Sequence, residues 1–312
     1  LDAGAFFSSE NDLRIYSYSF YDRGLPSANT IGKDDGTSDY AAINTPSVFL
    51  TGNWSATDQG GWGTGSWSAL RNINYFLEHA PKAPVSESIL NHYLGLARYW
   101  RAVFYLDKVQ TFSSVRWYDK ALNPDDEDLY KERDSREFVM DKVLEDINFA
   151  VDHLDSKKDT YGSLVNKYTA LAMKSRICLY EGTFRKYHSN MNLPDANKWL
   201  KDAAAAAKEL MDSGEYSLYN TGNPESDYRS LFISEDKSGA PQVAKEVILT
   251  NLMDKDSRVW HDLTWNFNSA TNGSRWSLLK QFVNTYLMTD GTRFTDQSNY
   301  DEIEFLQEMK GR

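Results

Sequence analysis

The chain has 312 residues, enough for one large domain or two ordinary ones, and its 34 Lys and Arg against 45 Asp and Glu give a net charge of −11. Nucleic-acid binding and adhesion to anionic lipid both need a basic surface, so this acidic balance disfavours both classes. No apolar run approaches the roughly eighteen residues of a membrane span, and the single cysteine, Cys178, excludes an internal disulfide and a cysteine-cluster metal site.

The first part of the chain predicts one helix followed by a long loop. Ser9 is a typical capping residue, and Glu10 and Asp12 place acids in the first turn of a helix over residues 9–22. Residues 24–65 are rich in Gly, Ser, Thr, Asp and Asn and break every periodic pattern, which predicts a loop with at most short strands. A loop of that length inside a compact domain is usually functional or disordered.

Apolar residues at helical spacing dominate the middle of the chain. They predict helices over 66–79, from about Pro84 to 105, 134–154, 164–187 and about 194–213. Small residues recur where these helices would approach closely, namely Ala97, Ala102, Ala170 and Ala172. The sequence therefore predicts a mainly α fold in which tetratricopeptide-like (TPR-like) antiparallel helix pairs form a scaffold with long decorated loops and minor β content.

Beyond Glu215 the sequence becomes irregular. The run over 246–250 is typical of a strand, and helices are predicted again near 276–287 and 299–310.

No motif supports catalysis or a resident metal. The five histidines lack the spacing of a zinc-binding helix, and the sequence contains no GxSxG. The glycine cluster Gly60–Gly65 precedes a helix but lacks the lysine of a phosphate-binding loop. The acidic run Asp125–Asp128 is interpreted as a solvated connector, with a calcium site as the alternative, and paired carboxylates for glycoside hydrolysis stay open. We predict no catalytic residue, no cofactor and a protein that is not an enzyme.

The tryptophans are more informative than the titratable residues. Six of the nine lie in two short polar windows, residues 51–68 and 260–276. An indole beside amides and hydroxyls suits a sugar, because a pyranose has an apolar C–H face and a rim of hydroxyls. The alternative is that these rings fix the loops onto the helical core. Trp67 is assigned to the core because it is in phase with Leu70 and Ile73.

The predicted glycan-binding residues therefore come from the two windows and exclude Trp67. They are Asn53, Trp54, Trp62, Trp260, Trp265 and Asn266.

Several segments, in order, carry a resemblance to one known family. They include WSALRNINYFL at 67–77, LARYWRAVFY at 96–105, FSSVRWYDK at 112–120, Arg133–Ile147, Asn166–Tyr180, Gly214–Leu218, Tyr228–Phe232 and YLMTDG at 286–291. Together they resemble the SusD/RagB family of outer-membrane nutrient-binding lipoproteins of Bacteroidota. Ser113, Ser114 and Arg116 stand where that family has Gly, Asp and Pro, which affects the local turn.

The resemblance implies a TPR-like scaffold whose loops bind a glycan at the cell surface. It also implies a SusC-like TonB-dependent transporter as partner and anchoring to the outer membrane through a lipidated N-terminal cysteine that is not present in this chain. We expect one SusD-like domain over 1–312, incomplete at both ends, with the scaffold at about 66–213 and ligand loops at about 24–65 and 215–312. The alternatives are a peptide-capturing member of the family, an all-α glycoside hydrolase and a generic TPR interaction scaffold.

Overall fold

The computed structural model describes residues 6–25, 38–43, 46–55, 60–63, 65–233, 243–269, 271, 276–303, 307 and 311. The chain divides into two compact units. Unit 1 comprises Leu1–Pro26 and Gly60–Arg258, and unit 2 comprises Ser27–Gln59 and Val259–Arg312.

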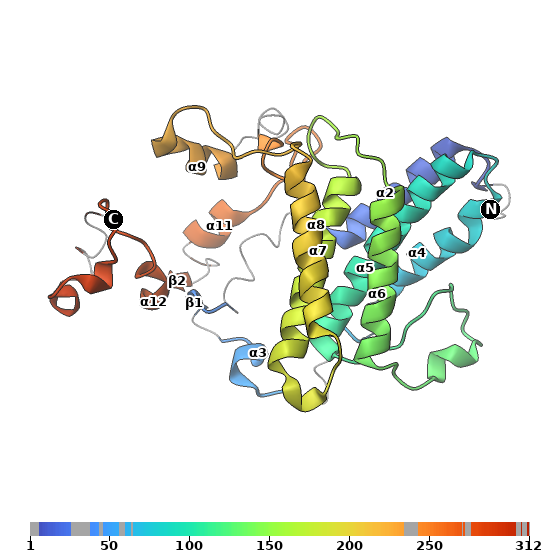
Figure 1. Cartoon of the computed structure of the whole chain (residues 1–312), viewed down its shortest axis with the longest axis horizontal. Helices are drawn as coiled ribbons and strands as arrows, with labels where there is room; N and C mark the ends of the chain where they lie inside the picture. Colours follow the sequence, from blue (N-terminus) through green and yellow to red (C-terminus); the bar gives the residue numbers. More distant parts are fainter. Residues whose placement is uncertain are drawn as a thin grey trace. The chain divides into compact units, whose positions relative to one another are not determined.

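Unit 1 is built from helices (Figure 1). They are α2 (Glu10–Gly24), α4 (Ser68–His79), α5 (Glu87–Phe112), α6 (Arg136–His153), α7 (Lys167–Tyr187), α8 (Ala196–Asp212) and α9 (Pro224–Ile233), with short 3₁₀ turns at Ala80–Lys82, Glu127–Tyr130 and Ser189–Met191. The helices predicted up to residue 213 are confirmed, and so is the mainly α fold.

Capping side chains set where the long helices begin. Ser9, Ser86 and Ser135 each accept a hydrogen bond from a backbone N–H of the first turn of α2, α5 and α6. Asn166 forms a capping box with Thr169 at the start of α7. Since each bond satisfies an amide that a helix leaves unpaired, α5 begins after Ser86 rather than at Pro84.

Helices α5 and α6 form an antiparallel pair. Arg101 of α5 contacts Asp146 of α6, and further along α5 the carbonyl of Val109 accepts a hydrogen bond from Arg136, near the start of α6. Residue numbers therefore rise along one helix as they fall along the other.

Helices α7 and α8 repeat this arrangement. Lys167 at the start of α7 pairs with Glu209 near the end of α8 at 3.0 Å. Gly182, near the end of α7, lies against Leu200, near the start of α8. The predicted TPR-like antiparallel helix pairs are thus confirmed.

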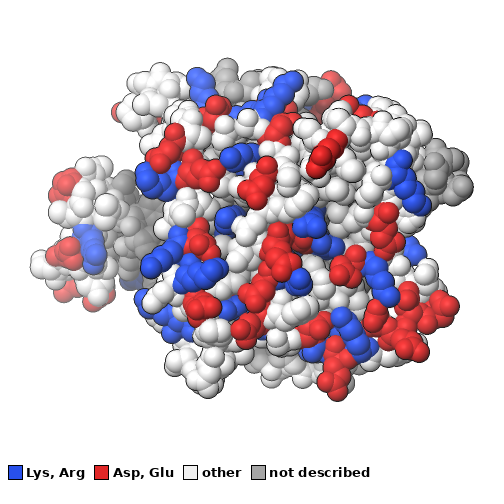
Figure 2. All heavy atoms as spheres, turned by 45° about the vertical axis from the view of Figure 1, so that its right-hand side comes forward, with Lys and Arg blue, Asp and Glu red and all other residues white. Residues whose placement is uncertain are grey.

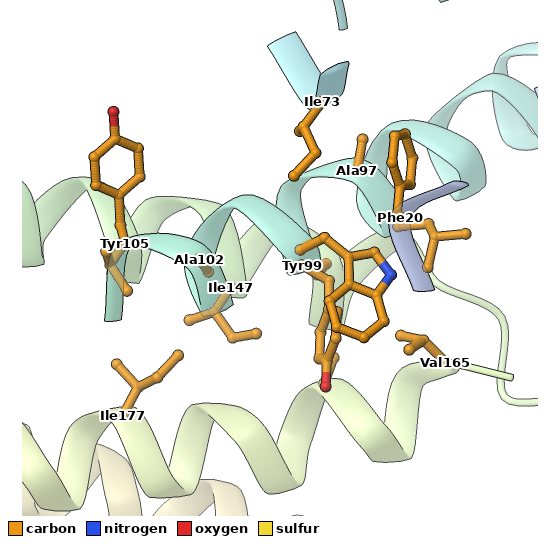
Figure 3. Close-up of a cluster of buried hydrophobic side chains, with 14 of the residues drawn as sticks. Phe20, Ile73, Ala97, Tyr99, Ala102, Tyr105, Ile147, Val165 and Ile177 are labelled. Carbon is orange, nitrogen blue, oxygen red and sulfur yellow. The ribbon is translucent and has the colours of Figure 1, made fainter. Parts of the chain in front are cut away.

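The core of unit 1 lies between α2, α4, α5, α6 and α7 (Figure 3). Each helix contributes nearly fully buried side chains, including Phe20, Ile73, Tyr99, Tyr105, Ile147 and Ile177. Burying one such side chain contributes about 1.5–3 kcal/mol. Ala97 and Ala102 have no exposed surface, and their small side chains allow the neighbouring elements to approach α5 closely.

A buried ion pair joins three of these helices to a loop. The Arg101 guanidinium donates to both Asp146 carboxylate oxygens, at 2.6 and 2.8 Å, and to the Asn74 Oδ1 at 3.2 Å. The Asn74 amide donates in turn to the backbone carbonyls of Tyr118 and Lys120. Helices α4, α5 and α6 are thereby tied to the α5–α6 loop, residues 113–135.

A second buried network surrounds Glu181 of α7, whose side chain has no exposed surface. Its carboxylate accepts hydrogen bonds from Arg136 at 2.8 Å and from Arg185 at 2.8 Å. Arg185 also donates to the carbonyl of Pro194, just before α8, and the Arg136 guanidinium lies 3.5 Å from the Phe184 ring centroid. This network connects α6, α7 and the segment that leads into α8.

Unit 2 contains a two-stranded antiparallel sheet and short helices. Strand β1 (Ala41–Ile43) pairs with β2 (Trp276–Leu278), with Ala41 opposite Leu278. The helical elements are α3 (Val48–Thr51), α11 (Leu263–Asn268), α12 (Lys280–Val283) and 3₁₀ turns at Phe294–Asp296 and Tyr300–Glu302.

Two predictions for the last third of the chain are wrong. The helix predicted over 276–287 begins as strand β2, because its backbone pairs with β1, and only 280–283 are α-helical. The run over 246–250 is not a strand: the amides of Glu246 and Val247 bond to the carbonyl of Val243. Of the helix predicted over 299–310, residues 300–302 form a 3₁₀ turn and residues 304–306 and 308–310 lie outside the described residues.

The predicted loop over 24–65 contains the short strand β1, as expected, and also the four-residue helix α3, which departs from the prediction of at most short strands. Residues 26–37, 44–45, 56–59 and 64 lie outside the described residues. Within the described part of the chain, no helix is long and apolar enough to cross a membrane.

We expect Asp146→Ala to lower the free energy of unfolding by about 3–5 kcal/mol, because it leaves the Arg101 guanidinium buried without its counter-charge. The control is Glu145→Ala, since the Glu145 side chain is 61% exposed beside Lys142. Its loss should stay at about 1 kcal/mol or below. Urea unfolding of both variants measures the difference, and equal losses would contradict the role of the buried pair.

Two helix glycines should respond to alanine with opposite signs. A Cβ at Gly182 would lie 2.8 Å from Leu200 Cγ and 3.0 Å from its backbone nitrogen, so Gly182→Ala should destabilise the chain by about 1–3 kcal/mol. At Gly95 the nearest atom, Leu154 Cγ, would be 3.4 Å away, so Gly95→Ala should stabilise it by about 0.5–1 kcal/mol through helix propensity. Thermal unfolding distinguishes the two, and shifts of the same sign would refute the close approach of α7 and α8.

Candidate functional site

Unit 1 contains a cavity of about 390 Å³ between α4 and the α5–α6 loop. Its volume lies within the range of small-molecule sites, roughly 300–1,000 Å³. Three aromatic side chains line it, Trp62, Trp67 and Tyr118, and so do three cationic ones, Arg71, Arg116 and Lys120.

The two indoles of the cavity are fixed by edge-to-face contacts. The ring centroids of Trp62 and Trp67 are 5.2 Å apart, and those of Trp62 and Phe112 are 4.9 Å apart. The Arg133 guanidinium lies over the Trp62 ring at 4.4 Å. Trp62 is therefore a half-buried wall of the cavity rather than a free ring.

The glycine-rich loop before α4 positions Trp62. Gly60 and Gly61 have φ values of 55° and 89°, in the left-handed region that favours glycine. The carbonyl of Gly61 accepts a hydrogen bond at 2.9 Å from the Nζ of Lys108, a largely buried lysine of α5. The glycine cluster thus forms a tight turn held by a lysine of the scaffold.

The three cations of the cavity differ in their partners. Lys120 is neutralised by Asp128 at 2.8 Å and Asp126 at 3.3 Å. Arg71 donates through Nε to the carbonyl of Leu122 at 3.2 Å, and Arg116 donates through Nε to the carbonyl of Lys131. Within the described residues, neither guanidinium has a carboxylate within 4.0 Å.

The acidic run Asp125–Asp128 supplies the two carboxylates that hold Lys120. Asp126 also accepts a hydrogen bond from the backbone N–H of Asn123, which closes a turn of the loop. Among the residues that the structure describes, no group of three His, Cys, Asp or Glu side chains could hold a metal ion.

Three of the predicted sugar-binding tryptophans lie in unit 2 and are exposed. The exposed fraction is 57% for Trp54, 52% for Trp260 and 62% for Trp265. Trp54 directly follows the turn at Gly52 that ends α3, Trp260 precedes α11 and Trp265 lies within it. Their indole faces are available to a ligand.

The six predicted residues divide between the two units. Asn53, exposed, adjoins Trp54, and Asn266, half-buried, follows Trp265 in α11. Trp62 lies in unit 1 and lines the cavity together with Trp67. Trp67 packs against the core as expected, yet it also faces the cavity.

Sequence reasoning missed Tyr118, Arg71 and Arg116 as cavity residues. Arg71 follows Trp67 by four positions, so helical spacing places both on one face of α4 and could have suggested the pairing. Tyr118 and Arg116 lie in a loop without periodicity, where no such signal exists.

Charge on the surface is mixed. Figure 2 shows acidic and basic side chains interspersed over the face in view rather than separated into one acidic and one basic region. The face therefore offers no continuous basic stripe of the kind that binds nucleic acid.

We compared the sequence and the fold with those of known proteins. No protein-family model matches the chain. A SusD-like protein of Formosa agariphila is 27% identical over 186 residues, which make up 59% of this chain and 32% of that protein.

Two crystal structures from Bacteroides fragilis are similar over most of this chain. One is a SusD-like carbohydrate-binding protein, with a TM-score of 0.73 and 19% identity, covering 98% of this chain and 58% of that protein. The other is a SusD-like protein with a TM-score of 0.71 and 22% identity, covering 93% of this chain and 55% of that protein. The chain thus spans little more than half the length of these structures, and its fold is similar to that of these SusD-like proteins.

Proposed function

We propose that the chain belongs to a protein that captures a glycan at the cell surface and delivers it to a transporter. The observation that carries the proposal is the exposure of Trp54, Trp260 and Trp265, each more than half accessible, in polar segments. Support comes from the similar fold of a SusD-like carbohydrate-binding protein.

Stacking and hydrogen bonding together would hold the sugar. An exposed indole offers a flat apolar face that excludes water from the C–H face of a pyranose, and covering such a ring stabilises a complex by about 1.5–3 kcal/mol. The amide of Asn53 beside Trp54, and that of Asn266 beside Trp265, can both donate to and accept from sugar hydroxyls. Delivery requires release, so we expect dissociation constants on the order of micromolar to millimolar.

The carboxylates of the two buried networks have structural partners, which agrees with a protein that binds a ligand without converting it. Asp146 and Glu181, the two carboxylates of the buried networks, are each held by arginines that join helices. These groups serve the fold, and we propose no catalytic role for them.

The partner and location follow from the resemblance in the sequence. We propose a SusC-like TonB-dependent transporter as the recipient of the glycan and the outer membrane as the site of anchoring, through an N-terminal lipid. The exposed indoles then act before transport, by concentrating the polymer at the surface.

We expect one or more polysaccharides to retard the chain in affinity electrophoresis, and Trp54→Ala or Trp265→Ala to weaken that retardation about tenfold, because each removes a stacking face. The control is Tyr187→Ala on α7, which removes an aromatic side chain that is 74% exposed. Binding that survives in both tryptophan variants would refute this site.

Other outcomes identify the alternatives. Binding of peptides with no retardation by any glycan would favour a peptide-capturing protein. Release of reducing sugar from a polysaccharide would favour a glycoside hydrolase.

A further inference from the structure

We infer that the cavity of unit 1 is a subsite for an anionic sugar residue, a uronate or a sulfated sugar, of the captured glycan. This inference rests on the proposed function and names a class of ligand for it. It is carried by Arg71 and Arg116, two unneutralised guanidinium groups on an aromatic wall.

The charged lining of the cavity has one sign. Among the residues that the structure describes, the charged side chains that line it are Arg71, Arg116 and Lys120, and none is acidic. Asp126 and Asp128 neutralise Lys120 from the loop, so its charge is used within the protein. The positive charges of Arg71 and Arg116 have no carboxylate partner among the described residues, which makes the cavity a local cationic site in a chain of net charge −11.

Each arginine is oriented before any ligand arrives. The Nε of Arg71 is bonded to the carbonyl of Leu122, and the Nε of Arg116 to that of Lys131. Because a guanidinium is planar, fixing Nε sets the direction of its two terminal nitrogens. Two such nitrogens form the fork that pairs with a carboxylate or a sulfate through parallel hydrogen bonds.

Each arginine shares the lining of the cavity with an aromatic residue close to it in sequence. Arg71 is one helical turn after Trp67 on α4, where its backbone N–H bonds to the Trp67 carbonyl at 3.1 Å. Arg116 is two residues before Tyr118, and both side chains line the cavity. Burial raises the pKa of the Tyr118 phenol, while Arg116 acts in the opposite direction.

The combination selects a chemical class. An indole wall accepts the apolar face of a pyranose, the Tyr118 phenol can bond to sugar hydroxyls, and the two forks accept an anion. A neutral sugar would leave both guanidinium groups without a counter-charge. A simple inorganic anion would leave the aromatic wall uncovered.

The test is affinity electrophoresis of the full chain in polygalacturonate, fully methyl-esterified pectin, a sulfated galactan and a neutral galactan. We expect retardation by the carboxylated or the sulfated polymer, and the one that binds identifies the anion. A polyanion repels a chain of net charge −11, so retention cannot come from general charge attraction.

The variants are Arg71→Gln and Arg116→Gln, with Arg229→Gln on α9 as control, because Arg229 is exposed and its loss changes the net charge equally. Each cavity variant should bind the anionic polymer about tenfold more weakly, while the control should not change. Any residual binding of the methyl ester or the neutral galactan should be the same in all variants, because these ligands carry no anion for the forks.

Four results would overturn the inference. Undiminished binding of the anionic polymer by both cavity variants would show that the forks are not used. Equal weakening for the free acid and its methyl ester would show that the arginines only hold the loop. Binding of the neutral galactan alone would remove the anionic subsite and retain glycan capture, whereas binding of no glycan would contradict the proposed function as well.

Discussion

The paired charges of Arg101 and Asp146 are the constraint on which the scaffold and the cavity both depend. Removing an ion from water costs several kcal/mol, so the pair persists only because its geometry is bidentate and the third guanidinium nitrogen donates to Asn74. The Asn74 amide in turn donates hydrogen bonds to the backbone carbonyls of Tyr118 and Lys120, and both residues line the cavity. A charge buried between α5 and α6 thus fixes the position of a loop on the surface.

The rigid helices and the proposed binding residues are different parts of this structure. Antiparallel helices with buried ion networks provide the rigid part, and the exposed or cavity-lining aromatic residues lie in loops, at a helix start or in the short helix α11. Loops can change without disturbing a packed core, which is why binding residues gather there. We propose two kinds of sugar contact: accessible indoles on unit 2, which suit a long polymer, and the cationic cavity of unit 1, which suits a single sugar residue.

The sequence predicted the helices well because their signals are local. Capping residues such as Ser9 and Asn166 and the apolar stripes of α4 to α8 need no knowledge of distant segments. Strand β2 was mispredicted because Trp276–Leu278 is too short to show a period, and its pairing partner β1 lies far away in the chain. Arg101 and Asp146 look like ordinary surface charges of two helices, and only tertiary packing buries them. For the same reason, the sequence does not distinguish Trp54 from Trp62. Trp54 is exposed, whereas Trp62 is fixed by contacts with Trp67 and Phe112.

We propose that exposed indoles capture the glycan. The most direct measurement is acrylamide quenching of tryptophan fluorescence as an oligosaccharide of the bound polymer is titrated into the chain. Among the tryptophans whose side chains the structure describes, Trp54, Trp260 and Trp265 are the ones more than half exposed, so they contribute most to the quenchable fluorescence of that group. We expect the fraction of tryptophan fluorescence that acrylamide quenches to fall and to saturate as the oligosaccharide is added, because stacking against sugar shields the rings from the quencher. Saturable binding with an unchanged quenchable fraction would contradict it.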